Sequence, residues 1–218
     1  MFPHPFFIVL ILLVLLFSIV QVGILSIAFD KLGLSQNTAF LIIFLSLFGS
    51  LINIPLFRMR SEAVKPMEIP IFLRGILRQK VREFHGYTTI AVNFGGCLIP
   101  LTVSSYLVTH QSIETSSLII SIIIMSAISY FASKPIHGIG VAMPIFVAPL
   151  CAALVALLLD AEHGAPLAYI CGTLGVIIGA DLFRLKDIKK MGTPIASIGG
   201  AGTFDGVFIT GIVAALLA

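Results

Sequence analysis

The sequence predicts an all-α, polytopic membrane protein of about seven transmembrane helices, with an irregular glycine-rich segment before or within the last helix. Of its 218 residues, 58% are hydrophobic and 11% are charged, whereas ordinary globular domains contain roughly 45–50% apolar and about 25% charged residues. The mean hydropathy is +1.12. Because a water-soluble fold cannot bury that much apolar surface, we expect the bilayer to solvate most of the chain. This composition excludes a separate aqueous domain and argues against nucleic acid as a partner.

Seven apolar segments supply the predicted helices, since a bilayer core about 30 Å thick needs roughly 20 apolar residues per helical crossing. Six are continuous runs, and the last is interrupted by glycines. They cover residues 6–29, 39–57, 87–108, 118–132, 141–159, 166–183 and 193–218. The first segment has no preceding basic residue and no small-residue cleavage site after it, so we expect a retained helix and not a signal peptide. Residues 1–218 are therefore predicted to form a single transmembrane domain.

Basic residues indicate the orientation, because loops rich in Lys and Arg stay on the cytoplasmic side of a membrane. Of the 13 Lys and Arg residues, the polar interval 58–85 carries seven and segment 184–190 carries four. Lys134 falls on the same side, and Lys31 falls on the other. We therefore expect a cell-membrane protein with a cytoplasmic amino terminus, a carboxyl terminus outside and a cytoplasmic basic loop at 58–85. Residues 69–77 within this loop could form an interfacial amphipathic helix.

Cysteine and histidine usage predicts neither a metal site nor another cofactor. Cys97, Cys151 and Cys171 each lie within an apolar stretch, and the chain has no C-x-x-C pair. We interpret these cysteines as small buried hydrophobic residues. The five histidines are scattered along the chain, which argues against a zinc site.

Two polar interruptions identify residues that could line a cavity, since such breaks are tolerated in a bilayer only where protein or water covers the backbone. The first is Asn93-Phe94-Gly95-Gly96, followed by Pro100, within the third predicted crossing. It is typical of a glycine-mediated helix contact with a proline kink, and Asn93 could alternatively line a site. The second interruption, 134–140, contains His137. It fits either a plain cytoplasmic turn or a broken, re-entrant helix beside a cavity.

A third interruption places two acidic residues on consecutive predicted crossings. Asp181 ends the sixth crossing, after Ile178-Gly179-Ala180, and Asp205 lies in the glycine-rich run of the seventh, 198–206. An aspartate at membrane depth costs a few kcal/mol or stays protonated, so it is a candidate functional group whose partner must be sought. Because consecutive membrane helices usually pack as neighbours, Asp181 is the natural partner of Asp205.

The depths of these two acids constrain the backbone between them. At a rise of 1.5 Å per residue, Asp181 would lie about 5 Å inside the cytoplasmic edge, whereas a regular seventh helix would carry Asp205 about 18 Å deep. The carboxylates can meet only if residues 193–203 are not a continuous transmembrane helix. Pro194 and the glycines that follow favour such an irregular stretch, which would leave 206–218 as a short closing helix.

Two carboxyl groups within about 3 Å share a proton, because repulsion between like charges lets only one ionise near neutral pH. The ionised group can act as general base on a water while the protonated group donates to a carbonyl oxygen, which is aspartic peptidase chemistry. We therefore predict Asp181 and Asp205 as catalytic residues and a transmembrane peptide as substrate. Residues near the second acid are expected to bind the substrate backbone: Gly199, Gly200, Gly202, Thr203 and Gly206.

Two alternatives use the same acids differently. In the first, both are ion-binding groups of a proton- or cation-coupled transporter or channel. In the second, the protein is not an enzyme, and one acid only caps amide groups of the glycine-rich turn. Membrane lipid is the other expected partner, and the pattern predicts no oligomeric state.

The motifs at 93–96, 137–140, 179–181 and 197–206 are together similar to those of a family of small prokaryotic membrane proteins known only as a domain of unknown function, which implies no activity. Acids on the sixth and seventh crossings also remotely resemble the intramembrane aspartyl proteases of the presenilin and signal-peptide-peptidase type. The prepilin peptidases similarly use a membrane aspartate pair. These proteases carry Gly-x-Gly-Asp, whereas Phe204 precedes the acid here, and their Pro-Ala-Leu motif does not follow it. The second resemblance implies an intramembrane endopeptidase that hydrolyses peptide bonds.

Overall fold

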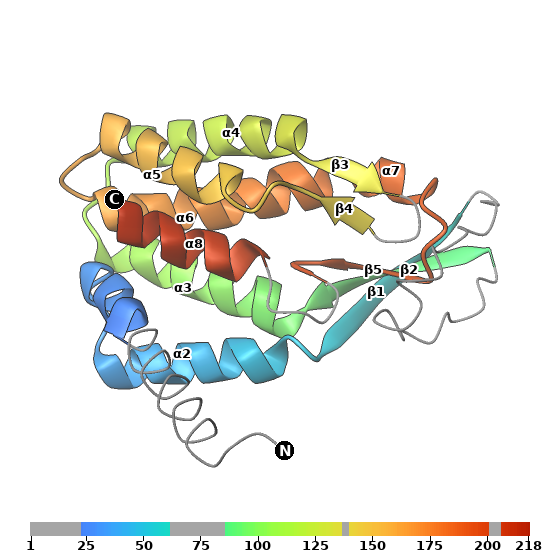
Figure 1. Ribbon diagram of the computed structural model, residues 1–218, viewed down its shortest axis with the longest axis horizontal. Helices are drawn as coiled ribbons and strands as arrows, with labels where there is room; N and C mark the ends of the chain where they lie inside the picture. Colours follow the sequence, from blue (N-terminus) through green and yellow to red (C-terminus); the bar gives the residue numbers. More distant parts are fainter. Residues whose placement is uncertain (1–22, 62–85, 137–139, 201–205) are drawn as a thin grey trace, which may run out of the picture.

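The computed structural model describes residues 23–61, 86–136, 140–200 and 206–218, which form a helical bundle with a small β-structure at one end (Figure 1). Two π-helical segments adjoin the bundle helices, η1 (Phe94–Leu98) before α3 and η2 (Ile177–Leu182) after α6. In chain order the described α-helices are Gly23–Lys31, α2 (Gln36–Gly49), α3 (Ile99–His110), α4 (Thr115–Ala132), α5 (Val147–Leu159), α6 (Gly164–Val176), α7 (Leu185–Ile188) and α8 (Gly206–Leu217).

The helix α6 lies at the centre of the bundle. It packs against α3, α4, α5 and α8, and the helices run alternately toward and away from the β-structure (Figure 1). In the span Gly164–Leu182, which joins α6 and η2, 72% of an 18-residue window is buried, against 28% for α4. Small residues on α6, such as Ala168 and Gly172, let neighbouring helices approach closely. The helix α4 lies on the outside of the bundle, and most of its apolar surface therefore faces away from the other helices.

Two described spans are long and apolar enough to cross a membrane, Thr115–Ala132 with 18 residues and Gly164–Leu182 with 19 residues. The helix Gly23–Lys31 and α2 would add a third if this pair, which is bent by 111°, forms one span. Helices α5 and α8 are apolar but shorter, with 13 and 12 residues. These helices are typical of a membrane protein. The total of seven crossings stays a prediction, and most of the first predicted segment, 6–29, lies outside the described residues.

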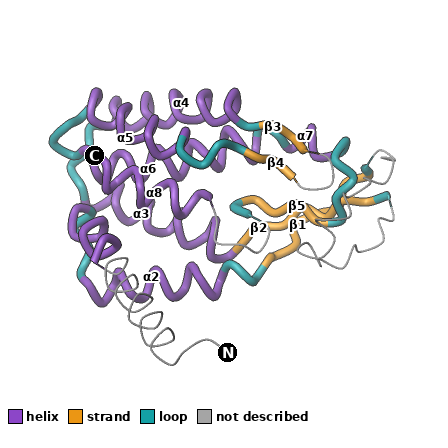
Figure 2. The backbone as a smooth tube through the Cα atoms, viewed as in Figure 1, coloured by secondary structure: helices purple, strands orange, loops and turns teal. Residues whose placement is uncertain are grey.

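The prediction of an all-α fold is wrong at one end of the bundle, where the structure has strands (Figure 2). Strand β1 (Asn53–Arg60) pairs antiparallel with β2 (Tyr87–Asn93), and β2 pairs parallel with β5 (Ile195–Ile198). A separate hairpin joins β3 (Lys134–Ile136) to β4 (Gly140–Ala142). The bundle therefore ends in a three-stranded sheet of order β1-β2-β5 and a two-stranded sheet.

Local sequence explains why strands replace the expected helix ends. The strand β2 contains Thr88, Thr89, Ile90 and Val92, and β-branched residues of this kind favour strands. The register of β1 shifts just after Pro55, a position where the missing amide hydrogen is tolerated. Hydropathy alone cannot distinguish an apolar strand from the end of an apolar helix. For this reason the segments 39–57 and 87–108 are predicted as continuous helices, whereas 193–203 is predicted only as an irregular stretch and not as a paired strand.

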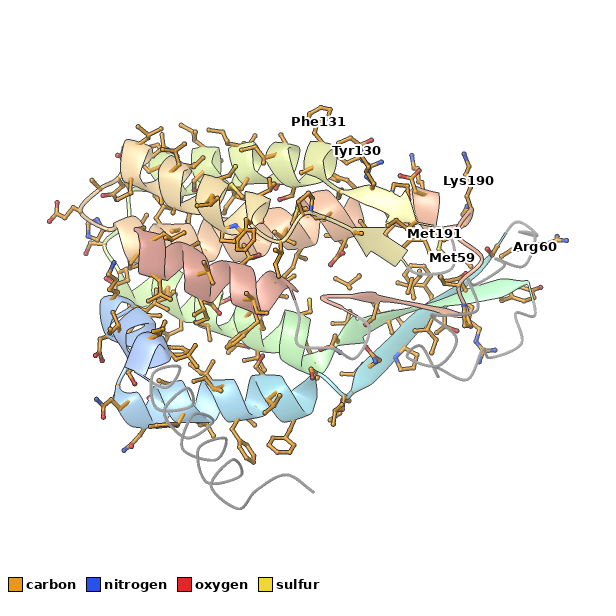
Figure 3. All side chains as sticks on the ribbon, viewed as in Figure 1. Met59, Arg60, Tyr130, Phe131, Lys190 and Met191 are labelled. Carbon is orange, nitrogen blue, oxygen red and sulfur yellow. The ribbon has the colours of Figure 1, made fainter. Side chains whose placement is uncertain are left out.

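Charged residues of the described chain separate toward the two ends of the molecule. Cations gather at the β-structure end, where Figure 3 labels two of them: Arg58, Arg60, Lys134, Arg184, Lys186, Lys189 and Lys190. The opposite end, where α4 and α6 begin, carries mostly acids: Asp30, Glu114, Asp160 and Glu162, beside Lys31. The interfacial helix predicted at 69–77 lies outside the described residues.

Candidate functional site

Asp181 lies on η2, at the point where α6 widens into a π-helical turn. Phe183 N donates a hydrogen bond of 2.9 Å to Ile178 O, five residues earlier. Such turns are rare and occur frequently at functional sites. The side chain of Asp181 is half-buried, and its Oδ2 accepts a hydrogen bond of 2.9 Å from Gly199 N. Within the described residues, this is the hydrogen bond that the Asp181 carboxyl group makes, and it leaves Oδ1 without a partner there.

The turn after β5 lies between the two π-helical segments. Gly199 and Gly200 have φ angles of +80° and +98°, a backbone region that favours glycine. A β-carbon at position 199 would lie 2.6 Å from Cys97 Cβ and 2.8 Å from Cys97 N, so this glycine packs directly on η1. Its amide meanwhile binds Asp181 of η2. The same residue therefore contacts both π-helical segments.

The backbone before this turn is not helical. Between Thr193 and Gly200 the chain forms the strand β5 and turns. The prediction that the last segment is no continuous helix therefore holds for residues 193–200, and the rest of that stretch, 201–203, lies outside the described residues. The closing helix expected over 206–218 is present as α8, Gly206–Leu217.

A buried polar network fixes the strand ends beside the turn. Asn93 is 1% exposed, and its Oδ1 accepts a hydrogen bond of 2.7 Å from Gly96 N at the start of η1. Its Nδ2 donates to Ser50 O at 2.6 Å and to Asn53 Oδ1 at 3.1 Å. Ser197 Oγ donates to the same Asn53 oxygen at 2.6 Å. The network thus connects the end of α2, strands β1 and β5, and η1.

We expect Asn93→Ala to lower the free energy of unfolding by about 2–4 kcal/mol, because each buried polar group left without a partner costs about 1–3 kcal/mol. Asn93→Asp keeps the acceptor for Gly96 N but loses both donors, so it should also destabilise the protein. Unfolding in mixed micelles followed by circular dichroism measures the change. Asn37→Ala, at an exposed position of α2, is the matched control and should stay within about 0.5 kcal/mol of wild type. Equal effects at both positions would contradict the network.

The other predicted site residues divide into described and undescribed positions. Gly200 and Gly206 are described, and Gly206 is the first residue of α8. The predictions made for Asp205, Gly202, Thr203 and His137 fall outside the described residues. Just after this gap, Val207 packs in one apolar cluster with Ala180 of η2 and Ile198 of β5. Val207, near the start of α8, therefore packs in the same apolar cluster as Ala180, the residue before Asp181.

Sequence reasoning missed two residues of this site, Asn53 and Ser197. Asn53 lies in a segment that is predicted as a membrane helix, and Ser197 lies in the stretch 193–203, which is predicted to be irregular but without a role for Ser197. The available signal was Asn53 itself, a polar residue that interrupts an apolar run and lies next to Ile54-Pro55. No cluster of three His, Cys, Asp or Glu residues suited to a metal ion occurs among the residues that the structure describes.

Comparison with known proteins gives one match. A family described as "Protein of unknown function (DUF1614)" matches residues 47–217. This confirms the resemblance to a family of unknown function. No curated protein and no solved structure matches the chain, and the resemblance to intramembrane aspartyl proteases gains no support from the comparisons.

Proposed function

Because the chain belongs to the DUF1614 family, whose description carries no activity, we propose a function from the site alone: an intramembrane aspartic endopeptidase in which Asp181 and Asp205 activate a water. The observation that carries this proposal is the hydrogen bond of 2.9 Å between Asp181 Oδ2 and Gly199 N. It ties the first acid to the backbone that leads, six residues later, to the second acid. The two acids can lie at the same depth in the membrane only if the backbone before the second acid is extended or irregular in this way.

The packing around the gap also supports a meeting of the two acids. Val207, two residues after Asp205, shares an apolar cluster with Ala180, the residue before Asp181. Residues 195–198 are extended, so this described part of the segment is not the regular helix that would separate the two acids by depth. We propose that the two carboxyl groups share one proton, as expected for acids about 3 Å apart.

The proposed reaction needs only water and these two groups. The ionised carboxylate takes a proton from water as the water oxygen attacks the carbonyl carbon, and the protonated carboxyl group donates to the carbonyl oxygen. Breakage of the C–N bond then releases the amine, which takes the proton that the first carboxyl group gained from water. The second carboxylate recovers its proton from a hydroxyl of the tetrahedral intermediate as the product carboxyl group forms, which restores the shared proton. The substrate must be extended, because a helical peptide bond is enclosed by its own hydrogen-bonded backbone. Strand β5 is the last in the order β1-β2-β5, and an extended peptide could add to such an edge.

Seven crossings with a cytoplasmic β-structure end complete the proposal. The separation of cations and acids between the two ends of the bundle supports this orientation. In a variant lacking the native cysteines, we expect Lys190→Cys to react with an impermeant maleimide only from the cytoplasmic side and Glu162→Cys only from the outside. Both parent residues are exposed. Labelling of position 190 from outside would overturn the orientation.

Cleavage is tested with the purified full chain in liposomes. A panel of single-span membrane peptides is added, and fragments are identified by mass spectrometry. We expect fragments with wild type and none with the Asp181→Asn, Asp205→Asn double variant, whose fold is checked by circular dichroism. Parallel proteoliposomes report ion and solute flux. Flux that requires both acids, with no acid-dependent fragments, would replace the peptidase by a transporter.

A further inference from the structure

A groove of about 750 Å³ opens on the outside of the bundle, where α4 ends and η2 leads into α7. Residues from both sides form it: Tyr130, Phe131, Leu182, Phe183, Leu185 and Lys186. Much of its surface is apolar and uncovered, since Phe131 is 78% exposed and Phe183 is 59% exposed. Figure 3 shows Tyr130 and Phe131 at the β-structure end of α4. In a chain that crosses the bilayer, apolar surface of this kind at the end of a span is suited to contact lipid acyl chains.

Arg184 holds the two sides of the groove together. Its guanidinium carbon lies 4.2 Å from the centroid of the Tyr130 ring. Its Nη2 donates to Tyr130 O at 2.8 Å and to Ser133 O at 2.9 Å, and these carbonyls at the end of α4 need such partners. Its Nη1 pairs with Asp187 at 3.0 Å. Asp187 neutralises the charge of Arg184. Arg184 therefore orders the walls of the groove, and a different residue must attract a charged ligand.

Lys186 supplies that charge. Its side chain is exposed, and no acidic residue pairs with it in the described part of the chain. The groove lies at the ends of both membrane-length spans, Ala132 and Leu182. Aromatic and basic side chains at such a position are typical of the interface between hydrocarbon and headgroups. The groove therefore combines apolar side chains with one cationic side chain.

We propose that this groove binds an anionic phospholipid, with an acyl chain against Phe131 and Phe183 and the phosphate at Lys186. The apolar surface alone would accept any lipid. The unpaired cation selects an anionic one, since basic side chains near the membrane surface attract anionic headgroups. The groove is lined by Leu182 of η2, but among the described residues it includes neither Asp181 nor Gly199, which is hydrogen-bonded to that acid. The lipid crosslinking and the cleavage assay therefore test the two proposals separately.

The test uses the full chain in phosphatidylcholine vesicles that contain a minor fraction of phosphatidylglycerol carrying a photoactivatable acyl chain. We expect crosslinks on peptides that contain Phe131 or Phe183, located by mass spectrometry. Lys186→Gln should reduce this crosslinking about five-fold, the effect expected for one basic contact at an anionic surface. Lys190→Gln removes an exposed cation at the same end but outside the groove, and it should leave crosslinking within two-fold of wild type.

Three outcomes would overturn the proposal. Equal losses from both lysine variants would mean a diffuse electrostatic surface in place of a site. Equal crosslinking by photoactivatable phosphatidylcholine would mean that the groove does not select charge. Displacement of the labelled lipid by inorganic phosphate alone would mean a phosphate site without a lipid chain.

Discussion

Asp181→Asn should lower cleavage of an extended membrane peptide by at least about 10²-fold, the effect expected for loss of a general acid or base. The substitution is close to isosteric, and the asparagine Oδ1 can still accept the hydrogen bond from Gly199 N. It therefore removes ionisation at this position while keeping the contact between η2 and the glycine turn. Initial rates of fragment formation in liposomes, measured by quantitative mass spectrometry, give the loss.

Two further variants separate catalysis from structure at this position. Asp181→Ala removes both the acid and the acceptor, so it should lose activity and stability together. Asp205→Asn should match Asp181→Asn in activity, and the double variant should be no worse, because residues that act as a unit give non-additive losses. Full activity in Asp181→Asn combined with unfolding of Asp181→Ala would show that the acid only caps the turn.

Gly199→Ala should be among the most destabilising single substitutions in the chain, and we expect it to lower the free energy of unfolding by about 2–5 kcal/mol. Two costs add here. A left-handed backbone conformation costs a non-glycine residue about 1–2 kcal/mol, and the new β-carbon would also lie 2.6 Å from Cys97 Cβ. Overpacking of a close contact typically costs a further 1–3 kcal/mol, approximately. Unfolding in mixed micelles, followed by circular dichroism, measures the sum.

Gly86→Ala is the matched control for this prediction. The φ angle of Gly86 is +79°, nearly that of Gly199, and a β-carbon at position 86 would meet no atom of the described residues within 4 Å. It should therefore report the backbone cost alone, about 1–2 kcal/mol. Equal losses of unfolding free energy in the two alanine variants would show that the close contact between Gly199 and η1 adds nothing to the cost of the substitution.

The helical part of the fold could be predicted from sequence because apolar length is a strong signal. The segment 118–132 predicts α4, Thr115–Ala132, within three residues at its start. The segment 166–183 likewise covers most of α6 and η2. Sheet pairing could not be predicted in this way. The partner of Ile195 is Thr89, far away in sequence, and nothing in either local pattern encodes that parallel register.

The candidate site shows the same division. Asp181 could be singled out, because an acid at the end of a membrane segment is costly and therefore conspicuous. The proximity of Asp181 to the glycine run could also be predicted, because the two segments follow one another in the chain. The bond to Gly199 N in particular could not be foreseen, since it depends on where β5 ends against η1 and η2. Asn53 and Ser197 were missed because their contact forms only when β1 and β5 flank β2.

The parallel pairing of β2 with β5 also determines when the site can assemble during synthesis. Thr88 Oγ1 donates to Thr193 O across a separation of 105 residues, so α3 to α7 must all leave the ribosome before β5 can join the sheet. Domains form progressively as chains are synthesised at about 5–20 residues per second. Until β5 arrives, Asp181 has no Gly199 amide to bind and the parallel edge of β2 is open. A nascent chain that stalls after α7 would hold Asp181 in an unfinished site, so any activity that needs this site would begin only after β5 and the residues that follow it have been made.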